Sequence, residues 1–302
     1  MEAQSMRVDA SVLYTLARPI RRLGLRSLRQ LVGLGLLHGV LIALGFTFLV
    51  PLLWVVSTSL KTPGQVFVVP VQWIPSSPRW TNYQEIFEIL PLTSFIRSSA
   101  IVSVLGTIGS ILSSLLVSFS LSRLRWPGRN VVFTLLLATL MLPGIVTLIP
   151  TFILFKYLGW VDTWYPLWVP SWFGGAFYIF LMRQFMLTLP YELDEAARVD
   201  GASSFRILTQ IITPLCGPAI ATVGIFSFLA HYNDFLGPLI YLSSNDKFTL
   251  PLGILWYQGR FGNFWHLVMA ASVVAILPVI ILFFLAQRYF VQGIQFTGLS
   301  GR

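Results

Sequence analysis

The chain has 302 residues, of which 56% are hydrophobic and only 10% are charged, and its formal net charge is +9. Soluble domains carry about one-quarter charged residues, so this composition excludes an ordinary soluble protein and indicates a polytopic membrane protein. The positive charge does not favour nucleic-acid binding, because the cations are not interleaved with exposed aromatic residues on one face.

The chain begins with a basic leader, residues 1–30, followed by an uncharged run from Leu31 to Leu60. A secretory signal peptide has a shorter apolar region that a small-x-small cleavage site follows closely. This run is too long and lacks such a site. We therefore expect a basic N-terminal tail and a retained membrane anchor.

Six uncharged runs are each long enough to cross the hydrocarbon of a bilayer, which takes roughly 20 residues. They predict an all-α membrane protein whose six-helix transmembrane domain covers residues 31–302, with an outer loop at 58–96. The expected helix cores are 32–57, 98–121, 131–154, 165–186, 218–242 and 266–288.

The distribution of cations predicts the orientation, because Lys and Arg are retained in short cytoplasmic segments. An even number of spans puts both termini on one side. With the termini in the cytoplasm, 14 of the 20 Lys and Arg residues lie inside and 6 lie outside. We therefore expect both termini, and the loop at 188–217, to be cytoplasmic.

The longest charged stretch, residues 191–218, begins in that loop. Its first acidic residues lie where they favour the positive end of a helix dipole; they are Glu192, Asp194 and Glu195. Gly201 can take a positive φ and end this helix, Ser203 or Ser204 can cap a second one, and Pro214 is expected to end it. Two interpretations remain open: an interfacial hairpin that packs only on its own membrane domain, or a docking segment for a partner.

Several classes of site are missing from the sequence. No lysine follows a glycine, so there is no G-x-x-x-x-G-K-[ST] phosphate loop and the chain is not expected to hydrolyse ATP alone. A single cysteine, Cys216, excludes an internal disulfide and a Cys-rich metal site. We favour packed or interfacial rings for His38, His231 and His266. No catalytic residue, metal ligand or cofactor is expected in this chain.

Two rival functions remain. An ion-coupled secondary transporter needs ionisable groups within the membrane, and the predicted spans offer Asp234, with His231 one helical turn earlier, and little else. A membrane-embedded enzyme would need a catalytic motif that the sequence does not show.

The charged segment contains a spaced set of small, acidic and apolar residues: Glu195, Ala196, Ala197, Asp200, Gly201, Ala202, Ile211 and Pro214. This set resembles the EAA signature of binding-protein-dependent ABC importer permeases, a cytoplasmic coupling helix that fits a cleft on the ATPase subunit. The resemblance covers the chain from about residue 40 to Gly301. It implies the type I importer fold, and it implies that ATP and Mg²⁺ are bound by separate ATPase subunits.

Further marks are similar to the carbohydrate-uptake branch, near maltose-type and sn-glycerol-3-phosphate-type permeases. They are Ser59-Leu60-Lys61, Asn82-Tyr83, residues 231–235 and residues 287–293. The resemblance implies a multi-pass protein of a prokaryotic inner membrane that imports a sugar, a polyol or a phosphorylated solute. Its implied partners are a second permease, two ABC ATPase subunits, an extracytoplasmic solute-binding protein and membrane lipid. A permease for a non-sugar solute is the remaining alternative within this family.

Relatives commonly have Trp-Asn-Glu or Trp-Asn-Asp at the site that here reads Tyr232-Asn233-Asp234. We place these three residues near the translocation path. A structural hydrogen-bond network between helices is the equally weighted alternative.

Overall fold

A computed structural model describes residues 25–260 and 264–298, and every regular element in these ranges is helical. The first elements are α2 (Leu25–Ser59), η1 (Pro63–Gln65), α3 (Asn82–Ile89), α4 (Leu92–Ser122), α5 (Arg129–Thr139), α6 (Gly144–Tyr157), α7 (Tyr165–Trp168), η2 (Val169–Phe173) and α8 (Ala176–Thr188). They are followed by α9 (Glu192–Val199), α10 (Ser204–Ile207), η3 (Leu208–Ile212), α11 (Thr213–Leu215), α12 (Gly217–Tyr232), α13 (Leu236–Tyr241), η4 (Asn245–Lys247), α14 (Leu250–Arg260) and α15 (Trp265–Gly298).

The chain divides into two units, residues 1–54 and 55–302. The described part of the first unit is the beginning of α2, an apolar helix long enough to cross a membrane. These properties agree with the predicted anchor. Most of the basic tail predicted at 1–30 lies outside the described residues.

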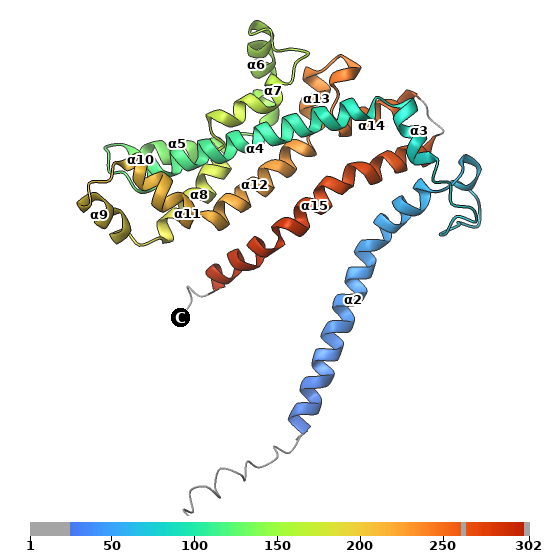
Figure 1. Ribbon diagram of the computed structural model, residues 1–302, viewed down its shortest axis with the longest axis horizontal. Helices are drawn as coiled ribbons and strands as arrows, with labels where there is room; N and C mark the ends of the chain where they lie inside the picture. The colour runs from blue at the N-terminus through green and yellow to red at the C-terminus, as the bar shows by residue number, and fades with distance from the viewer. Residues whose placement is uncertain (1–24, 261–263, 299–302) are drawn as a thin grey trace, which may run out of the picture. The chain divides into compact units, whose positions relative to one another are not determined.

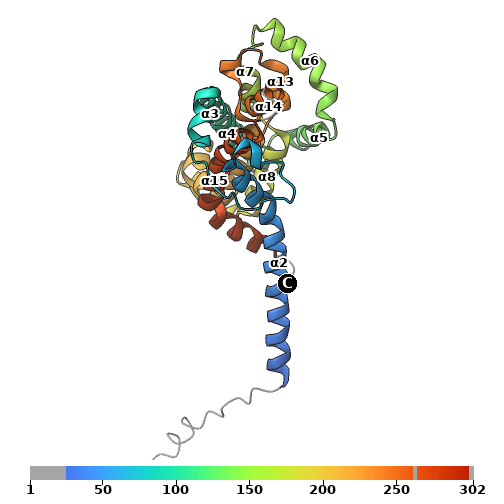
Figure 2. The same cartoon turned by 90° about the vertical axis from the view of Figure 1, so that its right-hand side faces the viewer.

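Within the described ranges, three helices are long and apolar enough to cross a membrane: Gln30–Ser59 of α2, all of α4, and Trp265–Gln287 of α15. Two bent pairs also have the length and composition of a span. The axes of α5 and α6 differ by 97°, and those of Ser204–Leu215 and α12 differ by 80°. Figure 2 shows α6 turning away from α5. The count is therefore three to five by length and composition, and the predicted six spans are not confirmed.

The predicted helix at 165–186 is wrong as a single helix. The structure has α7, then the short 3₁₀ helix η2, and then α8. Pro166 and Pro170 each remove a backbone donor, and Gly174 takes a φ of +99°, which a residue with a Cβ rarely adopts. Because these interruptions lie close together, the chain turns before α8 begins at Ala176.

The predicted helix at 218–242 is also too long. α12 ends at Tyr232, and the separate helix α13 begins at Leu236. The Asp234 carboxylate accepts a hydrogen bond from the backbone N–H of Gly237, at 3.1 Å. A carboxylate that caps the first turn of a new helix competes with continuation of the previous one. The polar pair therefore marks a boundary between helices.

Helix α4 packs along α12 and α8 through small residues (Figure 1). The Ser227 hydroxyl donates to that of Ser110 at 2.9 Å, and the Ser118 hydroxyl donates to the carbonyl oxygen of Ile179 at 2.9 Å. A Cβ on Gly106 would lie 2.4 Å from the ring of His231, so only glycine permits this approach. Small residues and hydroxyls are the usual means by which membrane helices pack closely.

Two apolar clusters lie along this second unit. One contains Phe95 and Val102 from the first half of α4, together with residues of α3, α14 and α15. The other contains Leu115 and Phe119 from the second half of α4, together with residues from α8 to α12. Figure 1 shows α3 and α14 near one end of α4, and α9 and α10 near the other. We name these the Leu92 end and the Arg123 end of α4.

Candidate functional site

The segment from Tyr191 to Leu215, named the coupling segment here, lies near the Arg123 end of α4 (Figure 1). Its first helix, α9, ends at a left-handed residue, because Gly201 has a φ of +78°. The N–H of Gly201 donates to the carbonyl oxygen of Arg198 at 3.0 Å, and that of Ala202 donates to the carbonyl oxygen of Ala197 at 2.9 Å. This pair of bonds is the Schellman arrangement that closes a helix. The predicted positive φ of Gly201 is confirmed.

The second half of the coupling segment begins as expected and ends differently. The Ser203 hydroxyl accepts a hydrogen bond from the backbone N–H of Arg206 at 3.3 Å and caps α10. The prediction that Pro214 ends this helix is wrong, because helical geometry continues to Leu215. A π turn at Leu208–Ile212 precedes the proline. Such a turn changes the backbone hydrogen-bond pattern, so a residue without an N–H fits inside the helical run.

The signature residues divide between two faces. Ala197 is buried, Ala202 and Ile211 are half-buried, and all three pack with the apolar cluster at the Arg123 end of α4. The exposed members are Glu195, Ala196, Asp200, Gly201 and Pro214. Two large apolar side chains of the same segment are also exposed, with relative accessibilities of 88% for Val199 and 68% for Phe205. The coupling segment thus presents an apolar and acidic surface while its other side is fixed to the membrane helices.

A buried ion pair, which the sequence analysis did not predict, fixes the coupling segment. Nη1 of Arg123 lies 2.9 Å from Oδ2 of Asp194, and the two side chains are 2% and 0% exposed. Nη2 of Arg123 donates to the carbonyl oxygens of Met186 at 2.6 Å and Leu189 at 2.9 Å. The Tyr191 hydroxyl donates to the carbonyl oxygen of Arg123 at 3.1 Å. One guanidinium thus joins the end of α4, the end of α8 and α9.

The sequence predicts one role for Asp194, Glu192 and Glu195, which is to favour the positive end of the helix dipole. All three do lie in the first turn of α9, but Asp194 alone is buried. A signal was present in the sequence: Arg123 directly follows the uncharged run 98–122 on the side predicted for the acidic segment.

A hollow of about 480 Å³ lies beside the buried pair, and its wall includes Arg125, Trp126, Glu195 and Arg198. Within the described residues, no ion pair within 4 Å joins Glu195 to either arginine. The carboxylate of Glu195 is exposed and therefore available to a partner.

The three residues predicted near the translocation path do not act together. Tyr232 is buried and its hydroxyl donates to the carbonyl oxygen of Ala275 in α15, at 2.8 Å. Asp234 caps α13. Asn233 is exposed and lines a hollow of about 450 Å³ that also includes Gln258 and Ser272. Tyr232 and Asp234 thus form structural hydrogen bonds, and the hollow beside Asn233 is lined by Tyr232 as well.

A polar joint connects loops near the Leu92 end of α4. The carboxylate of Asp162 accepts bonds at 2.9 Å from the N–H groups of Ser243 and Ser244, at 2.5 Å from the Ser244 hydroxyl and at 3.0 Å from Nζ of Lys247. Burial raises the pKa of Asp162, but the hydrogen bonds from Ser244, Ser243 and Lys247 lower it more, and the pKa lies well below its usual value. A hollow of about 480 Å³ adjoins the joint and includes Arg97, Trp164 and Trp168.

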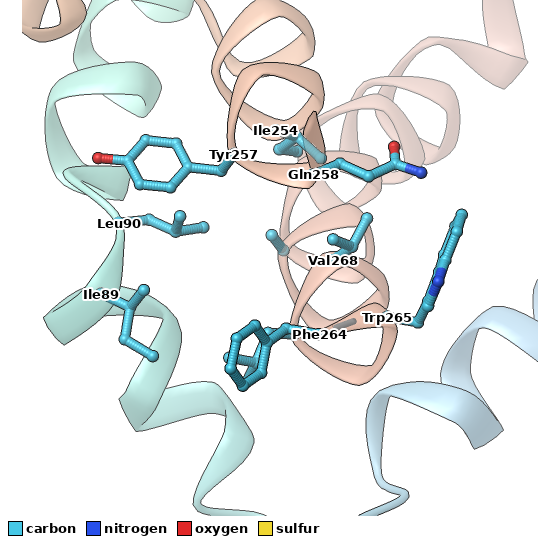
Figure 3. A pocket seen from close by; sticks show the side chains of 10 residues that line it. Ile89, Leu90, Ile254, Tyr257, Gln258, Phe264, Trp265 and Val268 are labelled. Carbon is cyan, nitrogen blue, oxygen red and sulfur yellow. The ribbon is translucent and has the colours of Figure 1, made fainter. Parts of the chain in front are cut away.

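An apolar cavity between α3, α14 and α15 is too small for a solute. Figure 3 shows Leu90, Ile254, Tyr257 and Val268 around it. Its volume is about 30 Å³, whereas ligand pockets measure about 300–1,000 Å³. Among the described residues no group of three or more His, Cys, Asp or Glu side chains could hold a metal ion.

Comparison with known proteins gives consistent results. The family model described as "Binding-protein-dependent transport system inner membrane component" matches residues 109–296. The chain is 34% identical over 254 residues to the sulfoquinovosyl glycerol transport system permease protein SmoH of Agrobacterium fabrum, which covers 84% of this chain and 89% of that protein. It is also 34% identical over 269 residues to the arabinooligosaccharides transport system permease protein AraQ of Halalkalibacterium halodurans, covering 86% and 96%.

The fold is similar to that of a chain in the crystal structure of a bacterial ABC transporter that imports the acidic polysaccharide alginate. The TM-score is 0.75 at 24% identity, over 85% of this chain and 96% of that one. At this identity the likeness shows the fold alone, and the family model and the relatives confirm the resemblance seen in the sequence. This chain belongs to the inner membrane components of binding-protein-dependent transport systems, as an ABC transporter permease subunit and not as an enzyme.

Proposed function

We propose that this chain forms half of a gated path through which an ATP-driven importer moves a carbohydrate, or a related polyol or phosphorylated solute. The named activities of its relatives support the solute class, since they are permeases for sulfoquinovosyl glycerol and for arabinooligosaccharides. The single observation that carries the proposal is the coupling segment, whose apolar and acidic outer surface is exposed although its inner side is packed.

The exposed surface is suited to a protein partner. Val199 and Phe205 provide apolar area, and Glu195 provides a charge beside them. Interfaces of this kind combine apolar anchors with charges that fix the orientation. The partner is an ATPase subunit, because the chain has no phosphate loop of its own. Two such subunits hold ATP and Mg²⁺, and a second permease supplies the other half of the path.

The same proposal fixes the orientation and the outer partner. The coupling segment and both termini are cytoplasmic, and an extracytoplasmic binding protein delivers the solute to the opposite side. Of the three residues considered for the path, Asn233 is the exposed one, and it lines a hollow together with Tyr232. Tyr232 and Asp234 form hydrogen bonds with α15 and α13, and these bonds stabilise the helices near Asn233.

The test is reconstitution. The chain is co-purified with its membrane and ATPase partners and placed in liposomes with the binding protein. ATP-dependent uptake is then measured for maltose, an arabinooligosaccharide, sulfoquinovosyl glycerol and sn-glycerol 3-phosphate. We expect uptake of one of these solutes, ATPase activity only in the complex, and a co-purified subunit that carries a phosphate loop.

Uptake driven by an ion gradient without any ATPase subunit would instead support a secondary transporter. Turnover of a substrate by the purified single chain would support an enzyme. A binding protein that binds none of these four solutes, but binds an amino acid or a metal ion, would show that the solute is not a carbohydrate.

A further inference from the structure

Helix α4 is bound by polar contacts at both ends and in its middle. At the Leu92 end, the buried hydroxyl of Ser99 accepts a hydrogen bond from the backbone N–H of Leu250 in α14, at 2.8 Å. In the middle, Ser110 bonds Ser227 of α12. At the other end, Arg123 bonds Asp194 of α9. The helix is 31 residues long, and Figure 1 shows it extending from the region of α9 to that of α14.

The Arg123 contact differs from the apolar contacts around it. Ala197, Ile207 and Ile212 also attach the coupling segment to the membrane helices. Apolar packing is non-directional, so such contacts permit one element to slide along another. Charge-assisted hydrogen bonds fix distance and direction, and a guanidinium donates several of them from one rigid plane. The Arg123 guanidinium, together with the bond from the Tyr191 hydroxyl to the Arg123 carbonyl oxygen, therefore resists sliding.

The position of Asp194 on α9 adds to this argument. It lies between Leu193 and Glu195, yet it is fully buried while Glu195 is exposed. A force on the exposed surface of α9 thus reaches the Arg123 guanidinium within one helical turn. Because Arg123 directly follows the last residue of α4, the force passes to the axis of that helix.

We propose that Arg123 is a positioning residue that makes α9 and α4 move as one body, so that nucleotide-driven movement of the ATPase reaches the Leu92 end of α4. This inference rests on the proposed function, because it requires an ATPase on the coupling segment. The residue touches no solute. Its role is to hold Asp194 and the carbonyl oxygens of Met186 and Leu189 in one arrangement during the transport cycle.

The experiment measures a distance inside the assembled importer in nanodiscs. Spin labels are attached at Glu192→Cys of α9 and Val104→Cys of α4 in a Cys216→Ala background; Glu192 and Val104 are both exposed. Distances are recorded without nucleotide and with vanadate-trapped ADP. We expect the parental distance to change by no more than about 2 Å, the scale of a small helix shift. In Arg123→Gln it should change by about 5 Å or broaden by that amount, the scale of one helical turn.

A second readout separates positioning from mere stability. The measured quantity is the number of ATP molecules hydrolysed for each molecule of the transported solute, compared at equal amounts of assembled complex. We expect this ratio to be at least about tenfold higher in Arg123→Gln than in the parent. Arg123→Lys keeps the charge but not the planar fork, and it should give an intermediate ratio. The matched control is Arg125→Gln, an exposed arginine two residues away that, among the described residues, contacts α9 only through the Tyr191 ring, 5.3 Å from its guanidinium. It removes a charge but no hydrogen bond to α9, so it should keep the parental distance.

Loss of the ion pair could also prevent folding, so a paired variant is included. Arg123→Met with Asp194→Leu removes both charges, and such apolar replacements of buried pairs often fold well. We expect this variant to assemble and to show the broadened distance and the raised ATP ratio. Parental distance and ratio in the paired variant, or its failure to assemble, would each show that the pair serves folding only and would overturn the inference.

The outcome also distinguishes this inference from the proposed function. A parental complex without ATPase activity would contradict the proposed function. An active parent whose Arg123→Gln variant keeps the parental distance and ratio would contradict the inference alone.

Discussion

Two ion pairs hold loops at opposite ends of the second unit, and they differ in burial. At the Arg123 end, the side chains of Arg123 and Asp194 are 2% and 0% exposed. Near the Leu92 end, those of Lys247 and Asp162 are 35% and 30% exposed. Nη2 of Arg123 meets two carbonyl oxygens, whereas Nε of Arg123 and Oδ1 of Asp194 are buried without a hydrogen-bond partner among the described residues. Loss of one partner from such a dry pair leaves a buried charge uncompensated, whereas a partly solvated pair is screened by water.

The difference in burial between the two ion pairs indicates different structural roles for the two ends of α4. The Arg123 end fixes the coupling segment to α4 in one geometry. The joint of Asp162 also contains two backbone N–H groups and a hydroxyl, so its carboxylate is held without the lysine. We expect substitutions at the Arg123 end to act through an uncompensated buried charge, and those near the Leu92 end to act through lost hydrogen bonds.

The largest expected effect follows removal of the buried carboxylate. Asp194→Ala leaves Arg123 dry and unpaired, and we expect it to lower the free energy of unfolding by about 3–5 kcal/mol. Denaturant titration of the detergent-purified chain measures this loss. The matched control is Asp200→Ala, an exposed acid at the end of the same helix, which should change the value by no more than about 0.5 kcal/mol. Equal losses of unfolding free energy in Asp194→Ala and Asp200→Ala would show that burial of the carboxylate is not the cause.

A smaller loss of unfolding free energy is expected where a substitution strains only the backbone of the coupling segment. A Cβ on Gly201 would meet no atom within 4 Å, and the same holds for Gly217, but only Gly201 has a positive φ. Gly201→Ala should therefore cost about 1–2 kcal/mol of unfolding free energy, while Gly217→Ala should cost nothing. Thermal unfolding of both variants tests this. A cost at Gly217 equal to that at Gly201 would show that φ is not the cause.

The third effect concerns binding to the ATPase. Glu195 lies beside the exposed apolar residues and Glu192 lies at the start of α9, so Glu195→Ala should weaken ATPase association by at least about tenfold, or 1.4 kcal/mol. Glu192→Ala should weaken it less. Affinities from surface-immobilised complexes measure both, and a double-mutant cycle locates the cation on the ATPase. Affinities within twofold of the parent for both variants would limit Glu195 to stabilising its own helix.

Local features of the coupling segment were predictable from the sequence, because neighbouring residues determine them. The positive φ of Gly201 and the cap by Ser203 follow from backbone freedom and from hydroxyl chemistry. The π turn before Pro214 was not predictable, since no residue type specifies it. The expectation for Pro214 considered only the missing N–H and not the ways a helix can accommodate it.

Contacts between distant residues were harder to predict. Asp194 and Arg123 are 71 positions apart, and the acids of α9 look alike in sequence; only packing decides which one is buried. The continuous apolar runs at 165–186 and 218–242 read as single spans because hydropathy does not register how Pro166, Pro170 and Gly174 divide a helix. Hydropathy thus located the apolar segments but did not give the number of spans.

The next prediction tests the joint near the Leu92 end by pH. The folded-state pKa of Asp162 lies below the unfolded value of about 3.9. Its stabilisation is therefore complete above about pH 4 and is lost as the pH falls towards the folded pKa. The melting temperature of the parent should fall between about pH 4 and pH 2 more steeply than that of Asp162→Asn, which cannot ionise. Identical slopes would mean that Asp162 does not contribute to acid sensitivity.

The smallest effect is expected at the lysine of the same pair. Lys247→Ala removes one of four hydrogen bonds to the Asp162 side chain and one bond to the Asp162 carbonyl oxygen, and it leaves the two backbone N–H groups and the Ser244 hydroxyl in place. Partly exposed pairs contribute about 0.2–1 kcal/mol, so we expect a loss in that range. Denaturant titration at low and high salt measures it, and the loss should shrink at high salt because the pair is screened. A salt-independent loss as large as that of Asp194→Ala would mean that both pairs are effectively dry, and burial would no longer distinguish the two ends.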